Sequence, residues 1–198
     1  MNYRILGDRI ESKYLRGGKV RSIHGTTILG VRRDGVVAMG SDGQVSLQET
    51  IMKETAKKVQ TLHEGAVLVG FAGALADALT LFSMFEEKLG SYPKNLPKAI
   101  IELAKSWRKD KFLRKLEALL GIMDKDNSFI LSGSGEVIQP DDGIVAIGSG
   151  GGYALSSARA LLKFSSLDAR SIVEESILLA SRVCIYTNNN ISIEVIEK

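Results

Sequence analysis

Apolar residues dominate two segments near the start of the chain, 27–32 and 36–40, which flank the pair Asp34-Gly35. An Asp-Gly pair between two apolar runs is a strong hairpin signal, so this pattern predicts two antiparallel strands. Shorter apolar segments at Val59 and over 66–71 predict two further strands. The chain therefore begins with a group of strands and no helix between them.

The spacing of apolar residues then changes to the three or four that is typical of a helix. One predicted helical face carries Leu75, Leu79, Phe82, Phe85 and Leu89. Proline residues interrupt the pattern, and a second helix is expected from about Pro97, because proline is tolerated in a first turn. Its apolar face carries Ile100, Leu103, Ala104 and Trp107.

The second half of the chain repeats this order of elements. Alternation at Leu116, Ala118, Leu120 and Ile122 predicts a strand, and further strands are expected over 128–131, 136–139 and 144–147. The glycine-rich run 148–152 precedes two more helices. The second of these is expected to bury Ile172, Ser176, Leu179 and Val183. A strand pair, 183–186 and 191–195, should close the chain.

Strands grouped with strands and helices with helices argue against an alternating βαβ fold. We expect an α+β protein in which two sheets pack face to face and a helix pair covers each outer side, a four-layer αββα sandwich. Residues 26–198 should form one domain. Residues 1–25 stand apart as a leader, a propeptide or the product of a mis-called start site.

Composition narrows the classes of function. The net charge is +3, but residues 1–25 carry +4 of it, so the body of the chain is close to neutral and offers no basic patch for nucleic acid. No apolar run reaches the roughly 18–20 residues of a membrane span. Cys184 is the only cysteine and cannot form an internal disulfide, which favours a reducing compartment.

The pair Thr26-Thr27, directly after Gly25, suggests a particular kind of catalysis. A threonine hydroxyl needs a nearby base, and an N-terminal threonine carries one in its own α-amine, whose reference pKa is about 8. The only histidines are His24 and His63, which argues against a Ser-His-Asp or Cys-His site and leaves zinc without ligands.

An N-terminal threonine also needs a nearby cation, a carboxylate and a backbone N–H that faces the oxyanion. The residues alone leave simpler interpretations open. Asp42-Gly43 is a common turn pair, Lys57-Lys58 a common solvated pair, and Cys184 a common buried apolar residue. Both glycine runs, 70–73 and 148–152, are typical of tight turns.

Eight stretches change this picture because they occur together and in one order. They are HGTTILGVRRDG (24–35), SDGQ (41–44), AKKV (56–59), VGFAGALADALTLF (69–82), IELAKSWR (101–108), LRKLEALL (113–120), AIGSGG (146–151) and CIYTN (184–188). With these stretches the chain resembles the HslV (ClpQ) family, the proteasome-type proteases of bacteria, over nearly all of 24–198.

The resemblance implies an N-terminal nucleophile (Ntn) hydrolase with threonine-type endopeptidase activity. It assigns Thr26 as nucleophile, Lys58 as cation, Asp42 as the carboxylate, the Gly70 N–H to the oxyanion, and Ser149 to the vicinity of the amine. It also implies a cation site, suited to Na⁺, made of backbone carbonyls at Ser181, Cys184 and Thr187.

For assembly, the resemblance implies two stacked six-membered rings with the sites inside. A separate AAA+ unfoldase ring, HslU (ClpY), gates them and delivers unfolded protein. ATP would serve that partner only, since this chain has no G-x-x-x-x-G-K-[ST] loop. The expected compartment is the bacterial cytoplasm, ahead of the mitochondrion.

The chain departs from the family pattern at several positions. Ser41 replaces the usual Gly before the aspartate, Gly152 replaces a Pro, and Lys53-Glu54-Thr55 replaces K-G-N. A leader of 25 residues is also unusual, because most bacterial members shed little more than a Met. None of these departures removes an expected catalytic residue.

Three other functions remain open from the sequence. The chain could be an inactive ring subunit or zymogen that keeps its leader. It could be a phosphate binder that uses 148–152, although Tyr153 breaks the G-x-G-x-x-G spacing. It could also be an amidase, because the fold hosts several amide chemistries.

Overall fold

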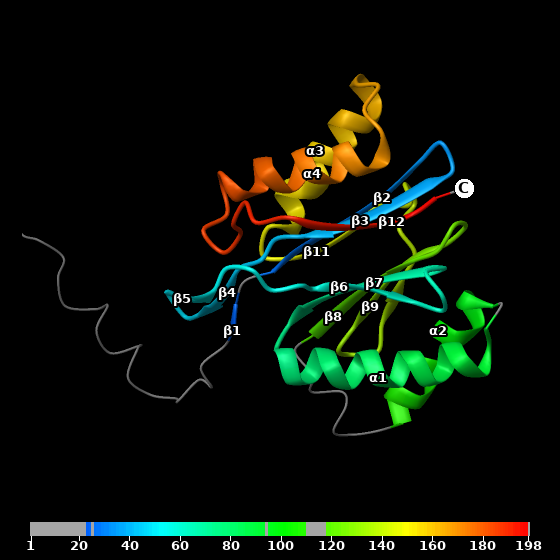
Figure 1. Cartoon of the computed structure of the whole chain (residues 1–198). Coiled ribbons are helices and arrows are strands. Elements are labelled where there is room, and N and C mark those ends of the chain that lie inside the picture. Colours follow the sequence, from blue (N-terminus) through cyan, green and yellow to red (C-terminus); the bar gives the residue numbers. More distant parts are fainter. Residues whose placement is uncertain (1–22, 25, 94, 110–117, 198) are drawn as a thin grey trace, which may run out of the picture.

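The computed structural model describes residues 23–24, 26–93, 95–109 and 118–197 (Figure 1). The expected leader, 1–25, lies outside the described residues except for Ile23–His24. The expected strand position Leu116 also lies outside them.

Most of the expected elements are present. The helices are α1 (Leu75–Ser91), α2 (Leu96–Lys109), α3 (Gly151–Phe164) and α4 (Ala169–Ser181). The strands of the first half are β1 (Ile23–His24), β2 (Thr27–Arg33), β3 (Val36–Ser41), β4 (Val45–Leu47), β5 (Thr50–Lys53), β6 (Val59–Leu62) and β7 (Val67–Gly73). Those of the second half are β8 (Ala118–Met123), β9 (Ser128–Ser132), β10 (Val137–Ile138), β11 (Val145–Gly148) and β12 (Ser192–Ile196).

Two antiparallel sheets form the centre of the molecule. One has the strand order β10-β9-β8-β7-β6 and the other β11-β2-β3-β12, so each sheet takes strands from both halves of the chain. The expected hairpin joins β2 and β3, with positive φ at Asp34 (53°) and Gly35 (81°), as tight hairpin turns require.

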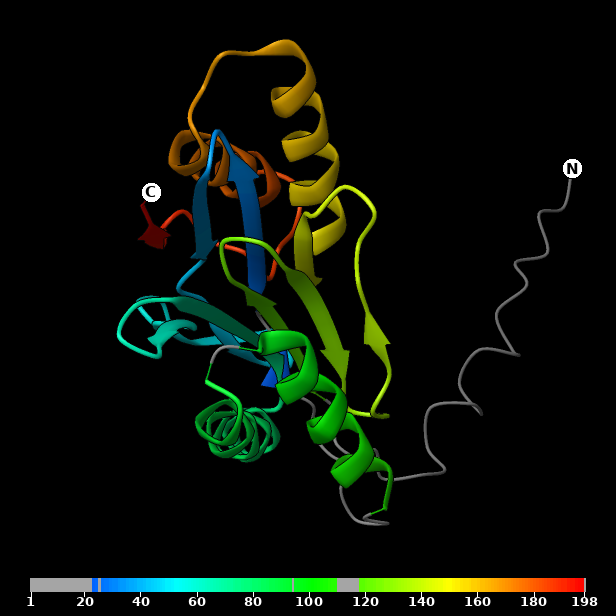
Figure 2. The same cartoon turned by 90° about the vertical axis from the view of Figure 1, so that its right-hand side faces the viewer.

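The four-layer αββα sandwich is confirmed (Figures 1 and 2). Helices α1 and α2 cover the five-stranded sheet, where Phe85 and Trp107 are fully buried. Helices α3 and α4 cover the four-stranded sheet. Between the sheets lies a third apolar core that includes Ile28, Met39 and Leu68. Burial of three apolar layers is the main stabilising contribution to this fold.

The buried faces of two helices differ from the expected ones. In α1, Leu79 is 48% exposed, and Ala78 and Leu81 face the sheet instead. In α4, Leu179 and the residue after the helix, Val183, are likewise exposed, and the small residue Ala180 is buried. Counting only large apolar residues misses alanines, which allow a helix to approach a sheet closely.

The expected strand at 183–186 is wrong. After α4 the chain makes successive turns in which Cys184 N–H donates to the carbonyl of Ala180 and Thr187 N–H to that of Cys184. Only β12 forms, and it pairs with the open edge of β3. The same apolar pattern therefore serves a turn here, because the available sheet edge belongs to another strand.

The structure adds a small three-stranded sheet that the sequence pattern does not predict. It has the order β1-β4-β5 and projects from the sandwich (Figure 1). All four residues of β5 are exposed, so its polar and apolar side chains show no alternation that would mark a strand. Through β1, the chain just ahead of Thr26 pairs with β4.

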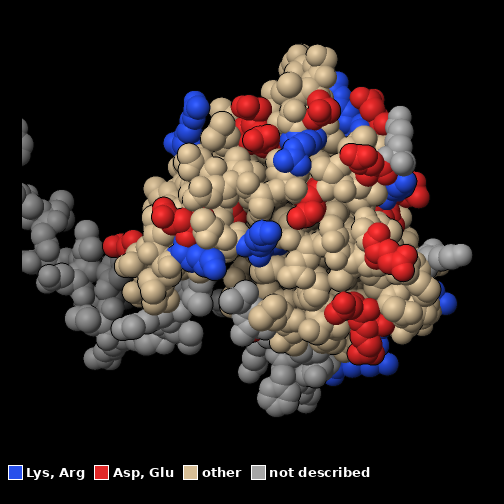
Figure 3. Space-filling view, viewed as in Figure 1, with Lys and Arg blue, Asp and Glu red and all other residues tan. Residues whose placement is uncertain are grey.

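Charged side chains of both signs are interleaved on the face shown in Figure 3. Separately, none of the helices in the described part of the chain combines the length and the apolar character that a membrane crossing requires.

Replacing Trp107 tests the core beneath α2. This side chain is fully buried, and its Nε1–H donates to the Gly133 carbonyl at 2.8 Å. Trp107→Ala should lower the free energy of unfolding by about 3–5 kcal/mol, because it leaves a large cavity. Trp107→Phe keeps most of the apolar contact and should cost only about 1–2 kcal/mol.

Trp107 is the only tryptophan, so both variants lose tryptophan fluorescence as a probe. Urea unfolding followed by circular dichroism therefore measures the free energy of unfolding of each. Equal stability of the wild type and Trp107→Ala would contradict the described core.

Candidate active site

Thr26 lies immediately before β2 and is 8% exposed. Its carbonyl accepts the Ser149 N–H at 2.8 Å. The next residue, Thr27, donates its N–H to Asp42 Oδ1 at 2.7 Å and accepts the Asp42 N–H at 3.2 Å. The backbone around Thr26 is therefore fixed by two other segments, one following β3 and one following β11.

Asp42 and Lys58 form a buried ion pair beside this backbone. Asp42 is fully buried and Lys58 is 3% exposed, with Nζ 2.9 Å from Oδ1. Lys58 Nζ also donates to the Gln44 carbonyl at 2.6 Å. The other carboxylate oxygen, Oδ2, accepts N–H groups from Gln44 at 2.8 Å and Asn188 at 3.4 Å. A buried pair is tolerable only when its groups are satisfied in this way.

Burial lowers the pKa of Lys58, and the nearby Asp42 charge and its hydrogen bond oppose that shift. The ammonium group therefore holds its proton less tightly than a solvated lysine, yet it has a fixed anionic partner. Such a group can supply positive charge next to a hydroxyl nucleophile and gives up its proton more readily than a solvated lysine.

The glycine-rich run after β11 explains the position of Ser149. Gly148 pairs with Thr27, has φ of +87°, and lies so close to Thr26 that an added Cβ would overlap the Thr26 carbonyl. Only glycine allows this approach. The run therefore brings the Ser149 N–H to the Thr26 carbonyl, and the expected role of Ser149 beside the amine stays a prediction.

Gly70 lies in the middle of β7, which is paired on one side with β6 and on the other with β8. The neighbouring Phe71 N–H donates to the Lys58 carbonyl at 3.1 Å. Because N–H groups alternate in an antiparallel ladder, the Gly70 N–H faces Gly121 of β8. The oxyanion role expected for Gly70 stays a prediction, and in the ladder its N–H lies on the β8 side of β7.

Sequence reasoning misses Gly73, where β7 ends with φ of +108°. The N–H groups of Gly73 and Phe71 point to the same side of β7, the side of β6. Gly73 lies beyond the point where β6 begins, so in the described chain β6 does not hydrogen-bond its N–H. The end of β7 lies close to Thr26, since a Cβ added at Gly148 would overlap the Thr26 carbonyl and lie 3.4 Å from Ala72 Cβ. A glycine that closes an apolar strand was the available signal.

Ser181, Cys184 and Thr187 lie in the turns that follow α4. The Cys184 carbonyl accepts the Thr187 N–H at 3.1 Å, and the Ala180 carbonyl accepts two N–H groups. Within the described residues, no backbone N–H of these turns donates to the Ser181 carbonyl. Carbonyls at a helix C-terminus attract cations, so the residues fit a hard cation. A side-chain site is not available, because the described residues hold no cluster of three His, Cys, Asp or Glu.

Thr187 also reaches the site directly. Its Oγ1 lies 2.8 Å from Thr27 Oγ1, and both residues are buried. The turn that would hold a cation is thus hydrogen-bonded to the residue next to Thr26. His63, in contrast, lies in the turn between β6 and β7, at the opposite end of these strands from Lys58 and Gly73.

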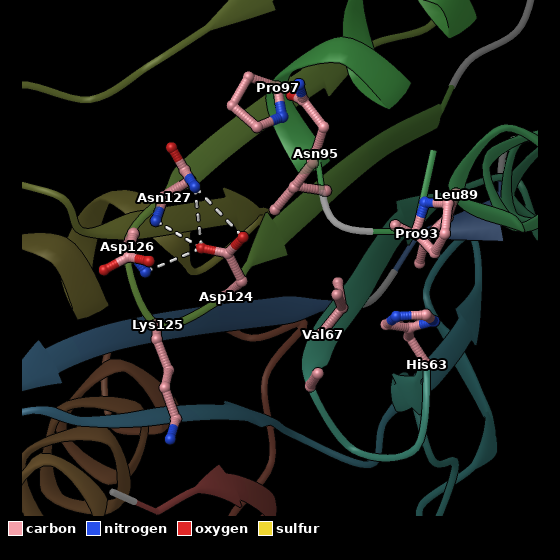
Figure 4. A pocket seen from close by; sticks show the side chains of 12 residues that line it. His63, Val67, Leu89, Pro93, Asn95, Pro97, Asp124, Lys125, Asp126 and Asn127 are labelled. Atoms are coloured by element: carbon pink, nitrogen blue, oxygen red, sulfur yellow. Dashed lines mark hydrogen bonds between the residues drawn. The ribbon is translucent and has the colours of Figure 1, made fainter. Parts of the chain in front are cut away.

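A cavity of about 490 Å³ lies at that opposite end (Figure 4). Its lining comes from the β6–β7 turn, the β8–β9 turn and the chain between α1 and α2. The Asp124 carboxylate points into its own turn, where it accepts hydrogen bonds from Asp126 and Asn127. This cavity is therefore separate from the residues around Thr26.

A threonine at the start of a strand, a buried Lys-Asp pair beside it and an αββα sandwich together define an Ntn hydrolase. A family model for the proteasome subunit matches residues 23–196. The chain belongs to the proteasome subunit family and is a threonine-type endopeptidase.

Individual relatives agree with this family. The chain is 56% identical over 179 residues to the ATP-dependent protease subunit HslV of Anaeromyxobacter sp. (strain Fw109-5), covering 88% of this chain and 99% of that protein. The crystal structure of eukaryotic HslV from Trypanosoma brucei matches with a TM-score of 0.82 and 40% identity, covering 87% of this chain and 99% of that one.

A more distant likeness concerns the fold alone. Thiobacillus denitrificans BPH in complex with epoxomicin matches with a TM-score of 0.67 at 19% identity, over 86% of this chain and 98% of that one.

Asp42→Asn tests the ion pair. It keeps the shape of the side chain but removes the charge that raises the pKa of Lys58, so this pKa should fall further. We expect kcat/KM for a peptide to fall about 10²-fold or more. The basic limb of its pH profile should move to lower pH, because Lys58 then loses its proton sooner.

Asp168→Asn is the matched control. Asp168 caps α4 by accepting the Ser171 N–H, far from the ion pair in the fold, and asparagine can cap equally well. This control should leave activity unchanged. Full activity and an unshifted profile in Asp42→Asn would contradict the role of the pair.

Proposed function

We propose that this chain is the proteolytic subunit of an ATP-dependent protease and that Thr26, once N-terminal, hydrolyses peptide bonds of unfolded proteins. The observation that carries the proposal is the buried Lys58–Asp42 pair, held by hydrogen bonds against the backbone that follows Thr26. The 56% identity to a protein named ATP-dependent protease subunit HslV supports it.

In the proposed reaction Thr26 Oγ attacks the substrate carbonyl while its own α-amine accepts the hydroxyl proton. The positive charge of Lys58 favours the alkoxide and the neutral amine. In this proposal the tetrahedral oxyanion forms near the end of β7 and accepts a hydrogen bond from the Gly73 N–H. The leaving amine takes the proton, and an ester on Thr26 remains, which water hydrolyses with the α-amine as base.

The α-amine becomes available when the Gly25–Thr26 bond is cut. Glycine at position 25 carries no side chain, which leaves room for Thr26 Oγ to attack the preceding carbonyl. Pairing of β1 with β4, through Ile23 with Leu47 and His24 with Ser46, supports this step, because it fixes the chain on the far side of that bond. The leader in this proposal masks the amine until the subunit is ready.

For the assembly we propose two stacked six-membered rings, with an HslU (ClpY) AAA+ ring that unfolds substrates, uses the ATP and activates the peptidase allosterically. Several large apolar side chains are strongly exposed on the single chain, among them Phe164 and Ile185, both 78% exposed. Exposed apolar surface of this kind is typical of subunit contacts. In this proposal the partner ring uses the ATP, and peptide hydrolysis by this chain needs no nucleotide.

A cation such as Na⁺ bound by the carbonyls of Ser181, Cys184 and Thr187 would stabilise the turns after α4. Such an ion would supply only a fixed positive charge near the Thr27–Thr187 contact. The bacterial cytoplasm, where a lone buried cysteine stays reduced, is the compartment we propose.

Hydrolysis by the assembled protease tests the proposal. Wild type should cleave a fluorogenic peptide and, with HslU and ATP, degrade an unfolded protein. Thr26→Ala should lose at least about 10³-fold of both activities, because no nucleophile remains. Thr26→Ser should retain part of them.

Thr61→Ala, a change of the same type at an exposed position of β6, controls for handling of the variants and should remain fully active. A wild type that forms rings but cleaves nothing would instead identify an inactive ring subunit. Equal activity in Thr26→Ala would place the chemistry elsewhere.

A further inference from the structure

The loop that follows α4, residues 184–190, contacts three segments around the site: Thr27, residues 42–44 and Glu54. The Ile185 carbonyl accepts from Gln44 Nε2 at 2.9 Å, and Thr187 shares a hydrogen bond with Thr27. Asn188 makes the largest set of contacts and is half-buried. Asn188 has no role so far in the proposed reaction: it is neither the nucleophile, nor a member of the ion pair, nor one of the residues whose carbonyls are expected to bind a cation.

Asn188 joins two segments that approach each other from different sheets. Its Oδ1 accepts the Gly43 N–H at 3.0 Å, and its backbone N–H faces Asp42 Oδ2 at 3.4 Å. Its Nδ2 donates to the Glu54 carbonyl at 2.9 Å, in the loop that leads to Lys58. One side chain therefore connects the turn of the carboxylate to the loop of the ammonium.

These two segments are in direct contact where Asn188 connects them. The Ala56 N–H donates to the Gly43 carbonyl at 2.9 Å. Gly43 packs so closely on Glu54 that an added Cβ would overlap the Glu54 carbonyl. The separation between Asp42 and Lys58 thus depends on how firmly Gly43 and the Glu54 loop are held together.

The chemistry of an amide suits this position. The contacts require one acceptor, facing the Gly43 N–H, and one donor, facing the Glu54 carbonyl, which fixes the orientation of the amide. An aspartate would lack the donor and would place a second negative charge beside Asp42. Asn190 supports the same carbonyl through its Nδ2 at 3.0 Å, but it contacts neither Asp42 nor Gly43.

We propose that Asn188 is a positioning residue for the peptidase reaction, which sets the distance and charge balance of the Asp42–Lys58 pair without touching the substrate. This inference rests on the proposed function, since it concerns the same site. It assigns to the loop after α4 a role in catalysis that does not depend on a bound cation.

The test compares kcat, KM and the pH profile of peptide hydrolysis in the assembled wild type, Asn188→Ala, Asn188→Asp and Asn190→Ala. Asn188→Ala should lower kcat about 10- to 100-fold, because small displacements of catalytic groups are costly. Its KM should stay within about twofold of the wild type, since a positioning residue does not bind substrate. Its basic limb should move to lower pH, because a loosened Asp42 raises the pKa of Lys58 less.

Asn188→Asp should also lower kcat but move the basic limb to higher pH, because the added negative charge favours the charged lysine. A general loss of structure would not move the basic limb in opposite directions in Asn188→Ala and Asn188→Asp, so opposite shifts indicate a positioning role. Asn190→Ala is the matched control. It should keep kcat within about threefold of the wild type, because Asn188 still bonds the Glu54 carbonyl.

If the wild type is active and both Asn188→Ala and Asn188→Asp keep full kcat and unshifted pH profiles, this inference is overturned and the proposed function stands. Equal losses in Asn188→Ala and Asn190→Ala would also overturn it, because the Glu54 bond would then account for the effect. If Asn188→Ala fails to fold, Asn188→Asp, which keeps the side-chain volume, decides by the direction of its shift. A correctly processed wild type without activity would overturn the proposed function, and this inference with it.

Discussion

The buried ion pair between Lys58 and Asp42 is the interaction on which the rest of the site depends. Moving two charges out of water costs several kcal/mol for each ion, so the pair persists only where hydrogen bonds satisfy it. Here the backbone N–H groups of Thr27, Gln44 and Asn188 face the carboxylate, and the Gln44 carbonyl accepts from the ammonium. The same N–H group of Thr27 that stabilises Asp42 also fixes the backbone next to Thr26.

The sandwich explains why such a pair can form. Asp42 follows β3 of the four-stranded sheet, and Lys58 precedes β6 of the five-stranded sheet. The pair therefore connects the two sheets at one end, where Thr26 precedes β2 and Ser149 follows β11. The apolar core between the sheets fixes their separation, and this separation brings the two charges within hydrogen-bonding distance. The fold thus supplies the low-dielectric setting in which a lysine can change its proton affinity.

Local patterns predicted the local structure well. The Asp34-Gly35 hairpin and helices α1 and α2 follow from turn chemistry and helical spacing, which depend on near neighbours in sequence. The resemblance to the HslV family then supplied Thr26, Asp42, Lys58 and Ser149, and the structure brings these together. The two threonines and the shortage of histidines already indicated the type of chemistry.

What the sequence did not predict concerns contacts between distant segments. The position of Gly73, beyond the point where β6 begins beside β7, depends on strand pairing that no local pattern records. The exposed strand β5 shows no alternation, and 183–186 would read as a strand anywhere an open sheet edge were available. Asn188 resembles an ordinary turn residue until Gly43 and Glu54 are seen on either side of it.

The central claim is that Thr26 acts as an N-terminal nucleophile, and the mature N-terminus tests this most directly. We would purify the full chain and Thr26→Ala and determine intact mass and N-terminal sequence for both. The account predicts that the wild type begins Thr-Thr-Ile-Leu while the variant keeps residues 1–25, because Thr26 cuts its own precursor. A wild type that keeps these residues and still hydrolyses peptides would contradict it, since Thr26 would then have no free α-amine.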